Sequence, residues 1–148
     1  SISPAPELFL GAVENPAAHP LGYRAERLSK KMSAGAQFFQ LQICYHDERL
    51  KEFCEKVHAA HPEIPILPTI VLVKGARPLK FMHDNVAGID IPTSIISQVE
   101  KADDQKEAAY KLAQAQAEFA LSLPGVRGLH MTDFRHDGSL ERLMRDLT

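Results

Sequence analysis

Three features that would indicate a particular environment are missing from this sequence. No apolar run approaches the ~20 residues that a transmembrane helix needs, and the first residues lack the charged start and apolar stretch of a signal peptide. The only two cysteines, Cys44 and Cys54, match neither the spacing of a metal site nor a redox CxxC motif. The seven histidines also lack ligand spacing. We therefore expect a cytoplasmic protein with reduced thiols, no membrane partner and no bound metal.

A strong charge of either sign is missing as well. The formal net charge of -2 gives no general attraction to nucleic acid, so no nucleic-acid partner is expected. The hydrophobic content of 45% is typical of a globular protein with a substantial core. A length of 148 residues favours a single domain, residues 1–148, and no internal repeat or low-complexity segment divides it.

Segments of strand type and helix type alternate along the chain. Apolar runs of strand length are expected to form strands at 8–14, 38–44, 64–73 and 128–133. Helices are expected at 23–34, 47–60, 75–83, 93–99, 103–123 and from residue 138 onward. This order predicts an α/β fold with a parallel sheet and right-handed crossovers. Four such βα units would make half of a (β/α)8 TIM barrel.

Residue spacing also predicts which side chains are buried. In the segment 47–60 the core face is expected to be Leu50, Phe53, Cys54 and Val57. In the segment 103–123 the buried stripe is expected to be Ala108, Leu112, Ala115, Phe119 and Leu123. In the segment 38–44 the residues expected to face the barrel lumen are Phe38, Gln40, Gln42 and Cys44. Two glutamines there are either amides satisfied inside the barrel or part of a ligand site.

Four stretches of the sequence resemble the C-terminal half of a methylenetetrahydrofolate reductase. They read GAVENPAAHP, LSKKMSAGAQFFQLQ, ILPTIVLVKGARPLKFM and GVRGLHMTDF. The resemblance implies a barrel that binds FAD and reduces 5,10-methylenetetrahydrofolate to 5-methyltetrahydrofolate, in the one-carbon metabolism that serves methionine biosynthesis. It implies NAD(P)H or a partner subunit as the electron donor.

The resemblance also implies a cofactor-binding set on the turn after the first strand and on the helix that follows. Its members are Asn15, His19, Arg24, Arg27 and Lys31. Arginine and lysine provide charge-assisted hydrogen bonds to a diphosphate. Taken without the resemblance, a basic cluster on a helix is more often a solvated helix face.

The substrate-binding residues implied by the resemblance are Gln42, Tyr45 and Arg135, with His136 as an alternative to Arg135. A glutamine amide offers a donor and an acceptor side by side, which suits the edge of a pterin ring. Pro78 stands where the family usually has a second folate-contacting glutamine. The catalytic acid of the family lies in the N-terminal half, so no catalytic residue is assigned in this chain.

Three functions remain open at this point. The chain is part of a flavin-dependent reductase, or a non-catalytic folate- or flavin-binding half-barrel subunit, or another TIM-barrel enzyme such as an aldolase. A half barrel on its own leaves two sheet edges unpaired. We therefore expect this chain to belong to a longer one, or to be completed by another chain or a second copy.

Overall fold

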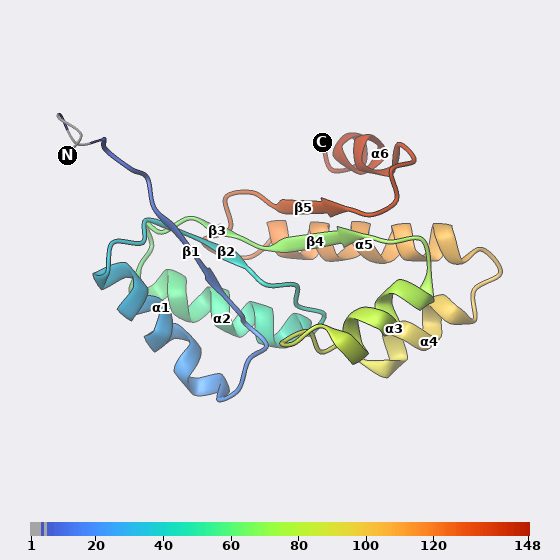
Figure 1. Cartoon of the computed structure of the whole chain (residues 1–148), viewed down its shortest axis with the longest axis horizontal. Coiled ribbons are helices and arrows are strands. Elements are labelled where there is room, and N and C mark those ends of the chain that lie inside the picture. The colour runs from blue at the N-terminus through green and yellow to red at the C-terminus, as the bar shows by residue number, and fades with distance from the viewer. Residues whose placement is uncertain (1–3, 5) are drawn as a thin grey trace.

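The structure is a computed structural model that describes residues 4 and 6–148 (Figure 1). Its strands are β1 (Gly11–Glu14), β2 (Phe38–Leu41), β3 (Ile66–Leu67), β4 (Thr69–Leu72) and β5 (His130–Asp133). Its helices are η1 (Leu21–Tyr23), α1 (Arg24–Ser33), α2 (Asp47–Ala60), α3 (Ala76–Asn85), α4 (Thr93–Glu100), α5 (Gln105–Leu121) and α6 (Ser139–Asp146). Within this part of the chain, no helix is both long and apolar enough to cross a membrane.

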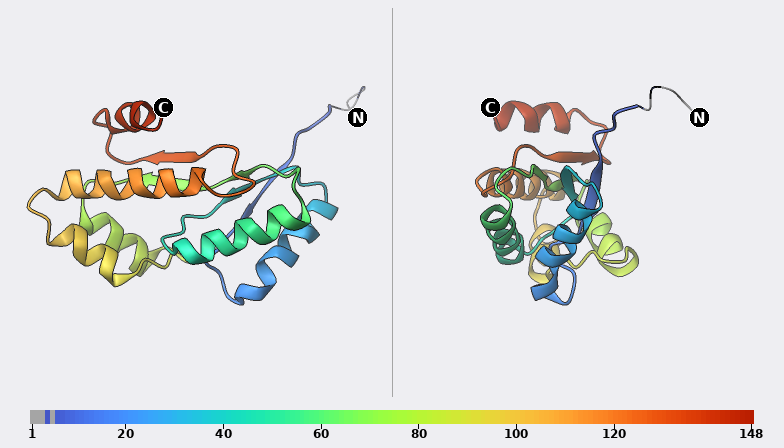
Figure 2. Two further views of the ribbon diagram at one scale, coloured as in Figure 1. Left: turned by 180° about the vertical axis from the view of Figure 1, so that it is seen from behind. Right: turned by 90° about the vertical axis from the view of Figure 1, so that its left-hand side faces the viewer.

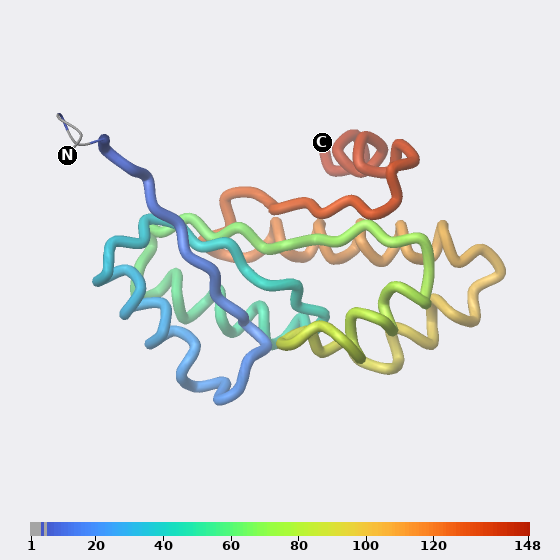
Figure 3. The backbone as a smooth tube through the Cα atoms, viewed as in Figure 1, coloured from blue at the N-terminus to red at the C-terminus, as the bar shows by residue number. Residues whose placement is uncertain are grey.

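All strand pairings are parallel, which confirms the predicted α/β class. The order is β1-β2-β3 in one sheet and β4-β5 in a second. Because β3 runs into β4 through Pro68, β1 and β5 are the outer strands of the series, and Figure 3 traces this path of the backbone. Gly11 pairs with Phe38 and Glu14 pairs with Leu41, and this register brings the carboxyl ends of β1 and β2 level with each other. Parallel strands joined by helices therefore gather their carboxyl ends along one rim, where ligands of α/β proteins usually bind.

Pro68 divides the strand expected at 64–73 into β3 and β4. Proline has no N–H to donate to the ladder, so it interrupts strand pairing. The Pro68 carbonyl still accepts a hydrogen bond from the His130 N–H at 2.9 Å, and the Thr69 hydroxyl donates to the Leu41 carbonyl at 2.6 Å. These two bonds link β5 and the end of β2 to the point where Pro68 interrupts the strand.

Helices lie against the strands (Figure 2), and the buried apolar side chains between them form three clusters. α1 and α2 cover β2, and this cluster includes Leu28, Phe39, Leu41, Phe53 and Cys54. α3 and α4 pack with the end of β4. α5 and α6 form the third cluster with Ile70, Leu72, Tyr110, Ala113, Ala117 and Leu143.

Two predictions about burial have different outcomes. In α2 the expected core face is confirmed, since Leu50, Phe53, Cys54 and Val57 are all buried. In the segment 103–123 the expected stripe is wrong except for Leu123, which is buried just after α5, because the buried residues of α5 itself are Ala109, Tyr110, Ala113, Ala117 and Ala120. The small alanine side chains allow α5 to approach β4 closely, and the larger Leu112 and Phe119 are left partly buried on the helix flank.

Candidate functional site

A buried glutamate lies at the carboxyl end of β1. Glu14 is only 3% exposed, and its strand neighbour on β2 is Leu41. From here the chain turns through residues 15–20 and returns as α1, which packs beside β1. Arg27 and Lys31 are four residues apart on α1, so they share one helix face, and that face points at Glu14.

Both cations are bonded to the Glu14 carboxylate. The Arg27 Nε and one terminal nitrogen donate to Glu14 Oε1 at 3.1 and 2.9 Å. Lys31 Nζ donates to Glu14 Oε2 at 2.9 Å and also to the carbonyl of Val13. The Asn15 N–H donates to Oε1 at 3.1 Å. The cluster therefore uses one edge of the arginine fork and two of the three lysine protons inside the protein.

The charges explain how a carboxylate is tolerated in this position. Burial on its own would raise the pKa of Glu14, but the hydrogen bonds from Lys31 and Arg27 outweigh it and hold that pKa below its ordinary value. Glu14 is therefore ionised at neutral pH, and the three side chains together carry a net charge of about +1.

Arg24, a third cation expected to bind FAD, lies inside the protein. Its side chain is 2% exposed, and it donates to the carbonyls of Leu21 at 2.7 Å and Arg49 at 3.3 Å. It also forms an ion pair with Glu52 at 3.4 Å. In this arrangement Arg24 joins the start of α1 to α2.

The turn after β1 contains the other two residues expected to bind the cofactor. The Asn15 side chain accepts a hydrogen bond from the Ala17 N–H at 2.9 Å and donates to the carbonyl of Gly88 at 2.8 Å. It thereby links the turn to the segment before α4. His19 is exposed in the same turn.

The residues expected from the sequence to bind folate on β2 and after it are less accessible to a ligand than predicted. β2 ends at Leu41, so strand alternation does not continue to Gln42 and Cys44. Gln42 lines a small cavity whose other walls include residues of α2 and α5, and its amide oxygen accepts a hydrogen bond from the Ile43 N–H at 3.1 Å. Cys44 is buried in the α1–α2 cluster and not in a lumen. Tyr45 is buried in the α3–α4 cluster, and this burial raises the pKa of its hydroxyl.

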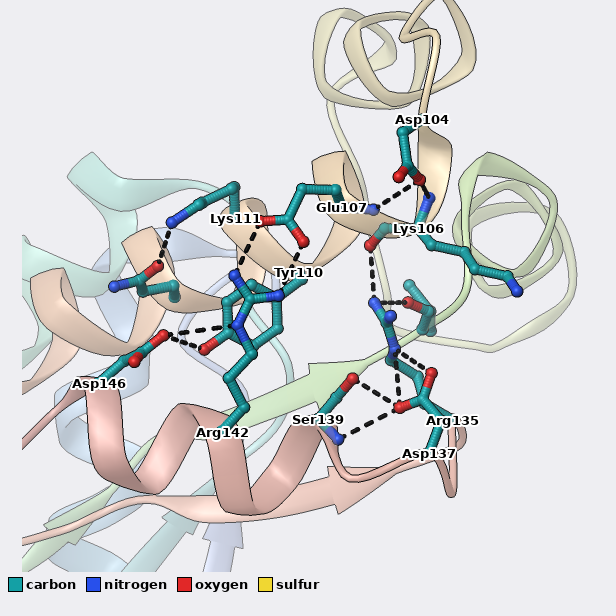
Figure 4. A network of polar contacts seen from close by, with 12 residues as sticks. Asp104, Lys106, Glu107, Tyr110, Lys111, Arg135, Asp137, Ser139, Arg142 and Asp146 are labelled. Atoms are coloured by element: carbon teal, nitrogen blue, oxygen red, sulfur yellow. Dashed lines mark hydrogen bonds and ion pairs between the residues drawn. The ribbon is translucent and has the colours of Figure 1, made fainter.

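Arg135 lies in a network of polar contacts between α5 and the loop before α6 (Figure 4). It is 6% exposed and donates to the carbonyls of Lys106 at 2.7 Å and Val73 at 3.3 Å. Its Nε pairs with Asp137, which in turn accepts hydrogen bonds from Ser139. Its contacts within the chain thus connect the end of β4, α5 and α6.

The same network continues along α6. Arg142 lies over the Tyr110 ring with its guanidinium carbon 3.8 Å from the centroid, and it forms two bonds to Glu107 at 2.7 and 2.9 Å. The Tyr110 hydroxyl donates to Asp146 at 2.6 Å. These contacts attach α6 to α5 (Figure 4).

An apolar cleft beyond the ends of β4 and β5 was not predicted from the sequence. It has a volume of about 430 Å³ and is lined by Arg77, Pro78, Phe81, Met82, Val86 and Phe134. Phe81 is 60% exposed and Phe134 is 58% exposed, which is unusual for aromatic side chains on a folded surface. Phe134 directly follows β5. An aromatic residue immediately after a strand, where a polar residue is more usual, is the sequence feature that could have indicated this cleft.

Comparisons with known proteins place the chain in a family. The family model described as methylenetetrahydrofolate reductase matches residues 12–148. The chain belongs to this family. A comparison with curated proteins finds no match.

Two solved structures are similar to this methylenetetrahydrofolate reductase family member. The first is an uncharacterized protein from Clostridium thermocellum that binds two copies of 5-methyl-5,6,7,8-tetrahydrofolic acid. It has a TM-score of 0.70 and 21% sequence identity, over 93% of this chain and 51% of that one. The chain thus spans about half the length of that protein, and the likeness shows the shared fold. The second, EDTA monooxygenase (EmoA) from Chelativorans sp. BNC1, is much less similar, with a TM-score of 0.41 and 9% identity over 91% of this chain and 42% of that one.

The residues expected to bind FAD do not fit a flavin diphosphate as they are arranged here. Arg24 is buried, and Arg27 and Lys31 are bonded to the Glu14 carboxylate. A diphosphate that reached these two cations would also meet a buried negative charge. Among the described residues, no three His, Cys, Asp or Glu side chains gather as metal ligands.

We predict that Arg135→Ala lowers the free energy of unfolding by about 2–3 kcal/mol, because it removes hydrogen bonds from a buried charged group. Urea denaturation followed by circular dichroism measures this change. Arg145→Ala, which removes an exposed arginine of α6, is the matched control and should change stability by less than about 0.5 kcal/mol. Equal stability of Arg135→Ala and wild type would show that Arg135 has no structural role.

We also predict a pH-dependent contribution from Glu14. Because its pKa is lower in the folded state, its carboxylate stabilises the fold above the unfolded-chain pKa of about 4.3, and this contribution is lost as the pH falls through the folded value. The difference in unfolding free energy between wild type and Glu14→Gln should therefore shrink from about pH 6 to about pH 3.5. Glu26→Gln, on the same helix, is the control. A difference that stays constant over this range would contradict the assignment.

Proposed function

We propose that the chain binds a reduced folate as the C-terminal half of a TIM barrel, with residues 1–148 forming that half. The family match over residues 12–148 carries this proposal. The binding of 5-methyl-5,6,7,8-tetrahydrofolic acid by the structurally similar Clostridium thermocellum protein supports the ligand class.

The strand arrangement supports the half-barrel part of the proposal. The strands follow the order β1, β2, β3 with β4, and β5, and each outer strand pairs with only one of the described strands. Near the outer strand β1, Leu8, Phe9, Leu10 and Val13 are exposed, and the Phe9 ring stacks on Phe38 at a centroid distance of 5.3 Å. The remaining strands, from a longer chain or a partner, would cover this apolar edge.

The apolar cleft suits the flat ring of a folate. Its volume lies in the range of small-molecule sites, and its two exposed aromatic rings offer stacking surfaces for a pterin. Arg77 at the same cleft offers a cation for a carboxylate of the glutamate tail. Pro78 also lines this cleft, and it stands at the position where the resemblance implied a second folate contact.

The second candidate function is reduction of 5,10-methylenetetrahydrofolate within the complete barrel, with electrons from NAD(P)H or a partner subunit. Membership of the methylenetetrahydrofolate reductase family favours it. Gln42 and Tyr45 would then have to become accessible in the complete barrel, because Tyr45 is buried here and the Gln42 amide oxygen accepts a hydrogen bond from the Ile43 N–H.

We predict that Phe134→Ala weakens binding of 5-methyltetrahydrofolate about fivefold, because one stacking contact is worth on the order of 1 kcal/mol. Isothermal titration calorimetry measures the affinity. Met144→Ala, which removes an exposed apolar side chain of α6, is the control and should bind like wild type. If Gln42→Ala loses affinity and Phe134→Ala does not, the folate lies near β2 and not in the apolar cleft.

The reductase candidate makes a separate prediction for the complete protein. With an added electron donor, that protein should convert 5,10-methylenetetrahydrofolate to 5-methyltetrahydrofolate, which chromatography of the two folates would measure. Folate binding without this conversion would support the binding function alone.

A further inference from the structure

Three of the four cations of α1 are bonded to an acceptor on another element or in the preceding turn, although the Arg27 and Lys31 side chains are 26% and 39% exposed. Arg24 is bonded to two carbonyls and to Glu52, and Arg27 and Lys31 are bonded to Glu14. The exception, Lys30, is exposed and pairs with Glu26 one turn earlier at 3.2 Å. The basic face of this helix is thus far less available to an anionic ligand than its sequence suggests.

Glu14 occupies one of the two pairs of N–H groups through which Arg27 could hold a phosphate. Arginine binds a phosphate most strongly through two parallel N–H groups, and here Nε and one terminal nitrogen of Arg27 share Glu14 Oε1. Lys31 donates hydrogen bonds to Glu14 Oε2 and to the carbonyl of Val13. A ligand phosphate would have to compete for these donors with a carboxylate that is already desolvated.

Electrostatics oppose such a ligand as well. Glu14 is 3% exposed, so little water screens its charge from a neighbouring anion. A phosphate bonded to both Arg27 and Lys31 would lie within a few ångströms of that carboxylate. Placing like charges at this separation away from water is unfavourable.

We propose that Glu14 is a built-in counter-ion that withholds Arg27 and Lys31 from the diphosphate of a dinucleotide cofactor. Glu14 is then a specificity-determining residue, because it excludes a diphosphate from the part of the rim at the carboxyl ends of β1 and β2. This inference rests on the proposed function in one respect: both concern ligands that bind at the carboxyl ends of the strands.

The test compares wild type with Glu14→Gln in the full chain, with ADP and FAD as probes. ADP carries the diphosphate without a flavin ring, so it reports on these cations directly. Glu14→Gln should bind both probes at least tenfold more tightly than wild type at low salt, and adding Lys31→Gln should remove the gain. Glu26→Gln removes the same charge from the surface of the same helix and should bind like wild type.

Two results would overturn the proposal. One is wild-type binding of ADP or FAD as tight as that of Glu14→Gln. The other is no detectable binding by either protein when circular dichroism shows both to be folded, because removal of the carboxylate would then have freed no site.

If Glu14→Gln does not fold, Lys31→Gln in the wild-type background decides the question. Equal or undetectable ADP binding by Lys31→Gln and wild type supports the proposal, because Lys31 is already withheld. A tenfold loss overturns it, since Lys31 would then be contacting the ligand. Binding of 5-methyltetrahydrofolate, measured in parallel, keeps failure of the folate proposal distinct from failure of this one.

Discussion

A carboxylate buried at the end of β1 has to be neutralised, and this requirement fixes the position of α1. Glu14 accepts hydrogen bonds from Arg27 and Lys31, one helical turn apart, so the helix can pack against β1 in only one rotation. That rotation turns Leu28 toward β2 and α2, where it is fully buried. The ion cluster and the apolar core thus specify the same orientation of α1, which is the agreement between local and global preferences that a unique fold needs.

The rim at the carboxyl ends of the strands has two different chemical halves. Near β1 and β2 it is polar, and its cations are bonded within the protein. Beyond β4 and β5 it is apolar, with two exposed phenylalanines and a cleft of about 430 Å³. The described residues therefore offer an apolar surface at the β4–β5 end of the rim and cations that are paired within the protein at the β1–β2 end.

The chain belongs to the methylenetetrahydrofolate reductase family, and it spans only about half the length of the similar Clostridium thermocellum protein. A family barrel divides its ligand contacts among loops from all its strands. In the half barrel that we propose, this chain supplies surfaces for a folate and the rest of the barrel supplies the remaining groups. The exposed apolar residues near β1 are consistent with such an edge between two parts of one barrel.

The sequence by itself determined the alternation of strands and helices, the parallel α/β class, the core face of α2 and the family. These follow from local patterns: side-chain periodicity, proline and glycine positions, and conspicuous motifs. The break at Pro68, which divides the strand expected at 64–73, also has a local cause, because a proline lacks the ladder donor.

Only the tertiary structure decided which polar side chains are free. Arg24, Arg27, Lys31 and Arg135 look alike in sequence as cations near a rim, yet each is bonded to an acceptor far along the chain or on another element. The buried face of α5 depended in the same way on how closely β4 approaches its alanines. Partners distant in sequence determine desolvation and pairing, and no local pattern contains them.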